Sequence, residues 1–485
     1  MLKENASVES GLVVFYRQSS LFIVNTVIFV AKFFIRDLNF EKDIGANGVS
    51  VKVGPFSFLI DAGMDPKRYG NEALPRFDLL EDGDIDFIVL THCHLDHLGS
   101  LPVVVRKQPQ AQILSSYPAQ LLAPLMLENS YSVMCRQKDE LSIPEYPLFS
   151  KDEVAQLLKK FLPLKYGTAY TLEKEGHCAT LTLFEAGHVL GASSVLIEYE
   201  GRQLLITGDI LFSDQNSLKG ARIPQLHSPD VVILETTRGA TQRKVSRRSE
   251  EERLIKTIAK TIKRGGACLI PAFALGRMQE MLVLLYKAKK ANKLPNCPIF
   301  CSGLGMSLIN TFDEMGKKSA CVNFSRQILR HLNVKSLRRK KLDPNTSKLV
   351  TPAIYLLSSG MLVEHTPAYN VAACLLGSAE NSICFVGYCD ERTPGGELQK
   401  AKPGATFCFD AINFSTKIRA KIDRFDLSGH ADREELCEFI GAQNPKKVVL
   451  VHGDEESRKW FSAIFSKNER SMSVLDPDVG KEYCL

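Results

Sequence analysis

Three histidines and one aspartate lie close together in the stretch Thr91-His92-Cys93-His94-Leu95-Asp96-His97. Imidazole and carboxylate groups are common ligands of zinc and similar cations. The stretch follows the mostly apolar run 85–90, which predicts a buried strand that ends where these side chains begin. His92 and His94 are two positions apart and suit one metal, whereas Asp96 and His97 suit a second. The spacing therefore favours a two-metal centre over a polar surface turn.

Other residues of ligand type also follow apolar runs that read as strands. The runs 57–60, 180–184, 203–207 and 231–234 lead into Asp61, His188, Asp209 and Glu235. Much later in the chain, Ser428-Gly429-His430-Ala431-Asp432 and Val449-Leu450-Val451-His452-Gly453 repeat this character. If these residues share one site, the C-terminal segment must fold back onto the N-terminal domain. The middle of the chain would then be an inserted domain.

The texture of the chain supports this organisation. Its 485 residues suffice for two sizeable domains. Up to about residue 239 the pattern is short strands and tight turns, with helices expected at 118–129 and 153–161. From about 240, an amphipathic helix (249–264), a strand (268–271) and a helix (276–290) predict an α/β domain with a parallel sheet. We expect a first part at 32–239, an insertion at 240–410 and a returning part at 411–485.

Composition indicates the cellular compartment of the protein more than its function. The net charge of +6 permits a polyanionic substrate without demanding one. Thirteen cysteines without a CxxC pair favour a reducing compartment, so we expect free thiols and a cytoplasmic location. The uncharged segment 18–31 is short of the roughly 20 residues of a membrane span. No membrane partner is favoured, although a buried element and an atypical targeting segment stay open there. The basic run 335–341 reads as a solvated loop, with a nucleic-acid contact as the alternative.

Taken in order, these motifs resemble those of the metallo-β-lactamase-fold hydrolases of the β-CASP subgroup. Within it the chain looks like the RNA endonucleases of the cleavage-and-polyadenylation type and their prokaryotic relatives. The resemblance covers about residues 35 to 465. It implies an α/β fold: an αββα metallo-β-lactamase sandwich with an inserted α/β β-CASP domain. A homodimer is left open.

The resemblance also implies two zinc ions and their ligands. One zinc takes His92, His94, His188 and Asp209. The other takes Asp96, His97, Asp209 and His452. Asp61 would orient this site from behind the ligands. The acidic motif at Glu235 departs from the family, because Thr236 and Arg238 stand where relatives usually have Ser and Tyr. We expect Arg238 to alter substrate contacts.

Two further segments resemble parts that surround the substrate cleft in relatives. They are Pro271-Ala272-Phe273-Ala274-Leu275-Gly276-Arg277 and Ser358-Ser359-Gly360-Met361. The candidate substrate-binding residues are accordingly Arg277, Ser358, Ser359 and Gly360. Arg277 suits a phosphate or a supporting role beside its helix equally well. The other three offer N–H groups and hydroxyls suited to a phosphate, and a plain turn is the alternative.

The chemistry implied is hydrolysis of a phosphodiester bond in RNA, single-stranded by preference, by a hydroxide held between two metals. Asp96, Glu235 and His430 are the expected catalytic residues. His430 would protonate the leaving oxygen as general acid, and Glu235 would orient it. Three alternatives stay open: a DNA nuclease of the same subgroup, a small-molecule metallohydrolase, and a non-catalytic scaffold of an RNA-processing complex. His452 favours RNA over DNA, since the DNA branch tends to have valine there. The sequence leaves internal and 5′-end cleavage undecided.

Overall fold

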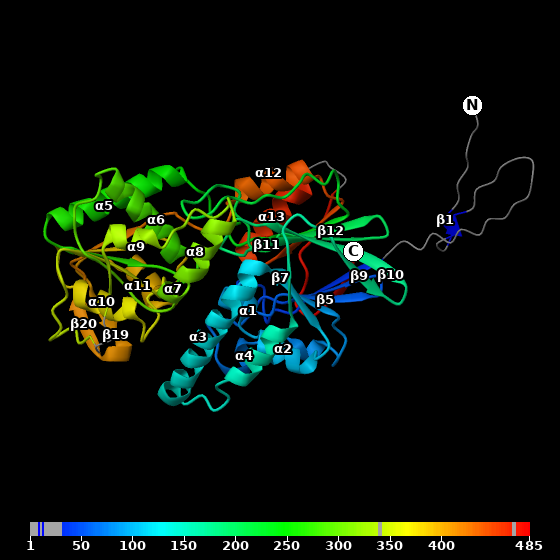
Figure 1. Cartoon of the computed structure of the whole chain (residues 1–485), viewed down its shortest axis with the longest axis horizontal. Helices are drawn as coiled ribbons and strands as arrows, with labels where there is room; N and C mark the ends of the chain where they lie inside the picture. Colours follow the sequence, from blue (N-terminus) through cyan, green and yellow to red (C-terminus); the bar gives the residue numbers. More distant parts are fainter. Residues whose placement is uncertain (1–7, 10–11, 14–31, 338–341, 468–471) are drawn as a thin grey trace, which may run out of the picture.

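The computed structural model describes residues 8–9, 12–13, 32–337, 342–467 and 472–485. Figure 1 shows two bodies, one built from the N-terminal part of the chain together with its C-terminal end, and one from the segment between them. The apolar segment 18–31 and the end of the basic run, 338–341, lie outside the described residues. Within the described ranges, no helix has the length and apolar character needed to cross a bilayer. All thirteen cysteines are free thiols, as expected.

The first body contains two seven-stranded sheets. In the first sheet the strand order is β24-β3-β4-β5-β6-β7-β8, and β5 to β8 run parallel. Its strands are β3 (Phe33–Asp37), β4 (Val49–Val53), β5 (Phe56–Ile60), β6 (Phe87–Leu90), β7 (Gln112–Ser116), β8 (Phe161–Leu164) and β24 (Glu482–Cys484). Because β5 and β6 are parallel, Asp61 and His92 follow strand ends at the same edge of the sheet.

The order in the second sheet is β23-β22-β13-β12-β11-β10-β9. Its strands are β9 (Tyr170–Lys174), β10 (His177–Glu185), β11 (Ser193–Tyr199), β12 (Arg202–Ile206), β13 (Val231–Glu235), β22 (Lys447–Val451) and β23 (Ser473–Leu475). The C-terminal strand β22 pairs in parallel with β13, so the end of the chain does return to the first body. β10, β12, β13 and β22 all point the same way.

Strand alternation explains why the two sheets stack. In β5, Phe56, Phe58 and Ile60 face the other sheet, and Leu59 faces the helices. In β13, Val231 and Ile233 likewise face inward. The outer layers are α1 (Leu95–Leu98), α2 (Leu101–Lys107), α3 (Tyr117–Leu141) and α4 (Lys151–Leu157) on the first sheet, and α12 (Arg433–Gln443) and α13 (Glu455–Lys467) on the second. The predicted αββα sandwich is confirmed.

The middle body is an α/β domain around a six-stranded parallel sheet of order β16-β15-β17-β14-β18-β21. Its strands are β14 (Ala267–Pro271), β15 (Ile299–Cys301), β16 (Val334–Ser336), β17 (Ala353–Leu357), β18 (Ser382–Phe385) and β21 (Lys421–Arg424), with the hairpin β19 (Thr406–Phe409) and β20 (Phe414–Lys417) beside them. Its helices are α5 (Arg247–Lys263), α6 (Arg277–Lys290), α7 (Leu304–Ser307), α8 (Ile309–Lys318), α9 (Gln327–Leu332), α10 (Pro367–Leu375) and α11 (Pro394–Lys400).

Some predicted boundaries differ from the structure. The edge strand β21 belongs to the sheet of the insert, so we propose that the insert ends near residue 425 rather than at 410. The helix expected at 118–129 runs on to Leu141, and the one expected at 153–161 ends at Leu157. Phe161 instead begins β8, because that segment pairs with β7. The helices and the strand expected between 249 and 290 are present within two residues of their predicted ends.

Candidate metal centre and acid pair

The predicted metal-ligand residues meet at one edge of the sandwich. His92 follows β6, His188 follows β10, Asp209 follows β12, and His452 comes directly after β22. These strands carry their carboxyl ends to the same edge, and the four side chains are at most 3% exposed. Each of these side chains follows the end of its own strand, and strands that run the same way end at the same edge of a sheet. The four side chains therefore come together in one cluster.

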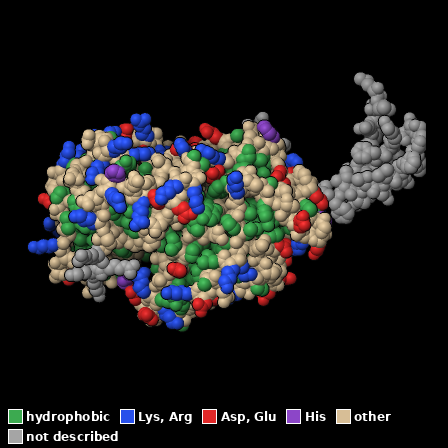
Figure 2. All heavy atoms as spheres, in the orientation of Figure 1, with side chains coloured by type: hydrophobic (Ala, Val, Ile, Leu, Met, Phe, Trp, Pro, Cys, Tyr) green, Lys and Arg blue, Asp and Glu red, His purple; other side chains and the backbone are tan. Residues whose placement is uncertain are grey.

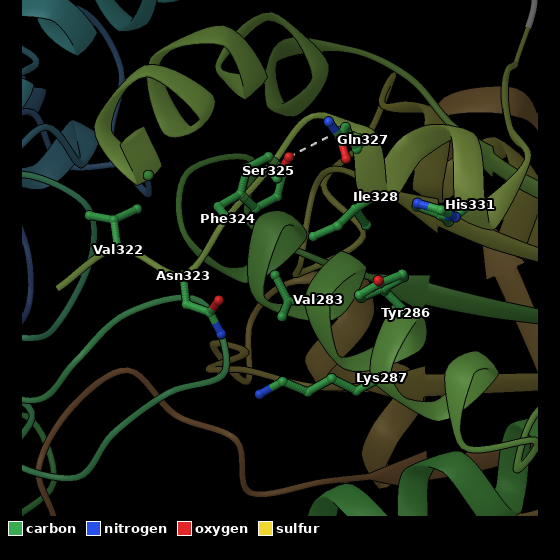
Figure 3. A pocket seen from close by; sticks show the side chains of 11 residues that line it. Val283, Tyr286, Lys287, Val322, Asn323, Phe324, Ser325, Gln327, Ile328 and His331 are labelled. Atoms are coloured by element: carbon green, nitrogen blue, oxygen red, sulfur yellow. Dashed lines mark hydrogen bonds between the residues drawn. The ribbon is translucent and has the colours of Figure 1, made fainter. Parts of the chain in front are cut away.

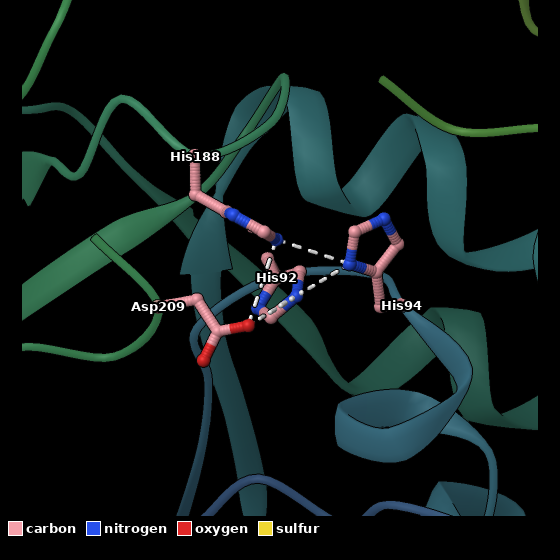
Figure 4. A group of neighbouring side chains, drawn as sticks. All are labelled: His92, His94, His188 and Asp209. Carbon is pink, nitrogen blue, oxygen red and sulfur yellow. Dashed lines mark hydrogen bonds and ion pairs between the residues drawn. The ribbon is translucent and has the colours of Figure 1, made fainter. Parts of the chain in front are cut away.

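The first cluster consists of His92, His94, His188 and Asp209, whose side chains point toward one another in Figure 4. His94 Nδ1 lies 3.1 Å from His92 Nε2 and 3.1 Å from His188 Nε2. Asp209 Oδ2 lies 3.6 Å from His92 Nε2 and 3.5 Å from His188 Nε2. Four ligand atoms therefore face one point.

The second cluster consists of Asp96, His97 and His452. His97 Nε2 and His452 Nε2 are 3.2 Å apart, and Asp96 Oδ2 lies 3.5 Å from His452 Nε2. Asp209 Oδ2 is 3.4 Å from His97 Nε2, so this carboxylate borders both clusters. The structure thus brings together the residues that the resemblance assigned to each zinc, with Asp209 beside the second cluster rather than in it.

The second ring nitrogen of each histidine is held by a neighbour. His97 Nδ1 is 2.7 Å from Asp61 Oδ2, and His188 Nδ1 is 2.9 Å from the carbonyl of Gly429. His94 Nε2 lies 3.3 Å from the carbonyl of Leu275, and His452 Nδ1 lies 3.1 Å from Thr237 Oγ1. Such partners fix the ring and leave the other nitrogen free to bind a metal.

These residues fit zinc on chemical grounds. In a tetrahedral site with ligand bonds of 2.0–2.1 Å, neighbouring ligand atoms are about 3.3 Å apart, close to the nitrogen separations in both clusters. In addition, Asp209 Oδ1 is buried and accepts no hydrogen bond among the described residues, although His452 Nδ1 lies 3.1 Å from it. Neutral imidazoles and a buried carboxylate at this spacing gain a common partner when a cation lies between them.

Burial and charge set the protonation of this cluster. Burial lowers the pKa of His92 and His188 well below the usual value, so these rings are neutral and able to bind a cation. Burial acts in the same direction on His97, but the nearby carboxylates, Asp209 first, outweigh it and raise its pKa. The pKa of Asp96 is lowered although burial opposes this, mainly because of His97.

A histidine–glutamate pair lies beside the metal cluster. Both Glu235 carboxylate oxygens are 3.1 Å from His430 Nδ1, and Glu235 Oε1 also accepts the Ile210 N–H at 2.8 Å. His430 Nε2 faces Asp209 Oδ2 at 3.9 Å. Burial lowers the pKa of His430, but Glu235 and Asp209 together outweigh it and raise the pKa. The pair that the sequence predicted is thus in contact.

The predicted substrate-binding residues lie in two settings. Ser358, Ser359 and Gly360 follow β17, and a Cβ on Gly360 would approach the Phe273 ring to 3.0 Å. The Phe273 ring is itself 6.4 Å from the His94 ring, so this turn borders the centre. Arg277 is only 5% exposed and donates to the Leu427 carbonyl and to Gln215 Oε1. Its contacts are those of the supporting role, not of a phosphate ligand.

Arg238 is also directed inward. Its guanidinium donates to Asp426 Oδ2 at 2.7 Å, and the residue is 8% exposed. This buried position does not support the expectation that Arg238 alters substrate contacts. Other supporting residues escaped the sequence reasoning. Thr91 donates its N–H and hydroxyl to Asp61, and its place just before His92 was an available signal. Gln215 and Thr237 carried no such signal.

A cavity away from the metal clusters lies in the insert. It measures about 230 Å³ and opens between α6 and the segment 322–331. Figure 3 shows Tyr286, Lys287 and His331 along its walls. None of its lining residues belongs to the metal clusters or to the His430 pair.

Comparison with known proteins agrees with this geometry. Three family models match in succession: the metallo-beta-lactamase superfamily over residues 54–249, the Beta-Casp domain over 278–398, and the Zn-dependent metallo-hydrolase RNA specificity domain over 415–472. The cleavage and polyadenylation specificity factor subunit 3 of Dictyostelium discoideum is 28% identical over 90% of this chain. Endoribonuclease YSH1 of Eremothecium gossypii is 26% identical over 87% of it.

The chain spans 55% of the length of each of these two relatives. A crystal structure of a protein of unknown function from Enterococcus faecalis V583 covers 94% of this chain with a TM-score of 0.56 and 14% identity, a likeness in fold. The family models together run through both bodies, and the two ligand clusters lie where strands of the first body end. The chain is thus similar, in order along its length, to the metallo-beta-lactamase superfamily, the Beta-Casp domain and the RNA specificity domain of Zn-dependent metallo-hydrolases.

Proposed function

We propose that this chain is a zinc-dependent RNA nuclease that hydrolyses phosphodiester bonds, with His430 as general acid. The observation that carries the proposal is the Glu235–His430 pair, in hydrogen-bond contact and next to Asp209, the carboxylate shared by both ligand clusters. A site that only bound metal would gain nothing from a second, separately oriented imidazole at its border.

Two zinc ions held by the clusters described above would supply a nucleophile at neutral pH and offset charge on the phosphate. His92, His94, His188 and Asp209 would hold one ion. Asp96, His97 and His452, with Asp209 between the two, would hold the other. Asp96 Oδ2 lies 3.5 Å from His452 Nε2, and we assign Asp96 a catalytic role in addition to holding the ion.

The remaining chemistry falls to this chain's own residues. As the oxygen of a hydroxide forms its bond to phosphorus, the opposite P–O ester bond breaks and its electron pair passes to the leaving oxygen. His430 Nε2 gives that oxygen a proton, while Glu235 keeps hold of Nδ1–H and stabilises the ring in the required orientation. Ser358, Ser359 and Gly360 border the centre through Phe273, and we propose that they bind a substrate phosphate.

The choice of RNA rests on family support. The matched domain at 415–472 is described as an RNA specificity domain, and one relative is called an endoribonuclease. On the face shown in Figure 2, Lys and Arg side chains are frequent over the insert, which suits a polyanion. A complete ligand set argues against a catalytically silent scaffold. The free thiols fit a reducing compartment, and we place the activity in the cytoplasm.

The test is a cleavage assay on end-labelled single-stranded RNA and DNA of one sequence, with zinc-loaded and metal-stripped protein. We expect the zinc-loaded protein to cut RNA, and the stripped protein to cut nothing until zinc is returned. A ladder of fragments at early times would mean internal cleavage, and released mononucleotides would mean cleavage from an end. Cutting of DNA alone would point to the DNA-nuclease rival. Zinc binding without any cutting would point to a scaffold.

A further inference from the structure

The loop that carries His430 is held in place by arginines from the insert. Arg247 Nη1 donates to the carbonyl of Ser428 at 2.9 Å, and its Nη2 reaches the carbonyl of Leu427 at 3.5 Å. Arg277 Nη1 donates to the same Leu427 carbonyl at 2.5 Å. Arg247 and Arg277 are the first residues of α5 and α6, so these two helices of the insert begin beside this loop.

Arg277 also connects the loop to the metal centre. Its Nη2 donates to Gln215 Oε1, and Gln215 Nε2 donates to the carbonyls of Gly187 at 2.7 Å and His188 at 2.8 Å. The circuit closes where His188 Nδ1 meets the carbonyl of Gly429. A single buried guanidinium thus relates the position of the His430 loop to that of a metal-ligand residue.

The packing around this circuit leaves little freedom. A Cβ on Gly429 would lie 3.1 Å from His188 Nδ1 and 3.4 Å from Arg277 Nη2. Arg247 is 8% exposed and Arg277 is 5% exposed, so neither reaches substrate from its place. Their partners on the loop are main-chain carbonyls, which do not depend on the identity of the loop side chains.

These arginines are costly choices for packing alone. Positive charge at the first residue of a helix opposes the helix dipole, and a buried guanidinium loses hydration. Glu280, at 1% exposure, lies 3.7 Å from Arg247 Nη2 and offsets part of this cost. Glu280 also accepts the N–H groups of Asn216 and Ser217, next to Gln215. Apolar side chains of similar volume would fill the space at a lower free-energy cost, but they could not donate hydrogen bonds to the Leu427 and Ser428 carbonyls.

We propose that Arg247 and Arg277 are positioning residues for proton delivery: they fix the main chain at Leu427 and Ser428 so that His430 Nε2 faces the leaving oxygen. The inference rests on the proposed function, in which His430 gives its proton to that oxygen. It adds that the insert, through the first residues of α5 and α6, sets the geometry of the acid step.

The test compares two substrates that differ in their need for an acid. Cleavage of single-stranded RNA expels an alkoxide that requires a proton, whereas bis(p-nitrophenyl) phosphate expels a stable phenolate that does not. We expect Arg247→Met and Arg277→Met each to lower kcat on RNA by about 10- to 100-fold, with KM changed less than about twofold. Hydrolysis of bis(p-nitrophenyl) phosphate and zinc content should stay within about twofold of the parent protein.

The controls separate positioning from folding. Arg248→Met, at the next position of α5 and with an 87% exposed side chain, should leave both substrates unaffected. If a Met variant does not fold, Arg247→Lys and Arg277→Lys keep the charge beside Glu280 but lose the two-ended guanidinium. They should show a smaller loss confined to RNA. Combining Arg277→Met with His430→Ala should be no worse than His430→Ala alone, because both act on one step.

His430→Ala decides which idea fails. If it slows both substrates equally, His430 is not the acid, and the positioning role is lost with it. If His430→Ala is selective for RNA but the arginine variants affect both substrates equally, or neither, only the positioning role is overturned. Additive losses in the double variant would overturn it as well.

Discussion

The metal-ligand clusters and the His430 pair lie side by side, yet different parts of the chain hold them. In the clusters, Asp61 and Thr237 of the sandwich hold His97 and His452, and of the cluster histidines only His94 has its second ring nitrogen beside a carbonyl of the insert, that of Leu275. His430 sits on a loop whose carbonyls are bound from the insert, by Arg247 and Arg277. Metal binding and proton delivery should therefore be separable by mutation, although both border one carboxylate, Asp209.

The largest effect should come from that shared carboxylate. Asp209→Asn keeps the size of the side chain but removes a charge that belongs to the first cluster and lies 3.4 Å from His97 of the second. We expect loss of bound zinc, measured by elemental analysis, and loss of hydrolysis of every substrate. Asp214→Asn, on the same loop with a 57% exposed side chain, is the matched control. Retention of two zinc equivalents in Asp209→Asn would show that the clusters do not share this residue.

His430→Ala should separate the two regions most clearly. The variant should bind zinc like the parent, because His430 belongs to neither of the two ligand clusters and its Nε2 lies 3.9 Å from Asp209 Oδ2, while RNA cleavage slows by about 10²- to 10⁴-fold. Zinc content and single-turnover rates give both quantities. His331→Ala, an exposed histidine of the insert, serves as control. Loss of zinc from His430→Ala would contradict the separation.

A smaller effect is expected from Asp61, which supports the clusters from within the sandwich. Asp61→Asn removes the charged partner of His97 Nδ1, and partners of this kind are worth about 10- to 100-fold in metal affinity. Competition with a chelator measures the affinity, and excess zinc should restore the rate on both substrates. Asp84→Asn, whose side chain is 32% exposed, is the control. A rate that excess zinc cannot restore would place Asp61 in the reaction itself.

The smallest effect should come from Thr237, a neutral partner of His452. Thr237→Val removes the neutral hydrogen bond to His452 Nδ1, worth about 0.5–1.5 kcal/mol, or about 2- to 13-fold in zinc affinity, and with it the weaker bond that the hydroxyl donates to the His452 carbonyl at 3.3 Å. The same chelator competition, run beside Asp61→Asn, checks the order of the two variants. If Thr237→Val lost more zinc affinity than Asp61→Asn, the idea that a charged partner matters more than a neutral one would be wrong.

Much of the site was readable from sequence because its signals are local. An apolar strand followed by Asp or His shows at which strand end a candidate ligand lies. Asp209 follows the strand that ends at Ile206, and His452 follows the strand that ends at Val451. Element ends were less readable when a distant partner set them. Phe161 was expected to close a helix, and it begins a strand because β7 is available to pair with it. β21 was expected beyond the insert, and it completes the insert's sheet.

By itself, the sequence determined which residues could bind metal and, through the order of its motifs, the fold that would gather them. Only the tertiary structure determined the hydrogen-bond partners of Arg277, Arg238 and Gln215, since the residues next to them in the sequence do not indicate those partners. Arg277 is separated by 150 positions from the Leu427 carbonyl that it binds. Periodicity and spacing report on neighbours along the chain, whereas a buried guanidinium takes its role from whichever carbonyls the closed fold brings within its reach.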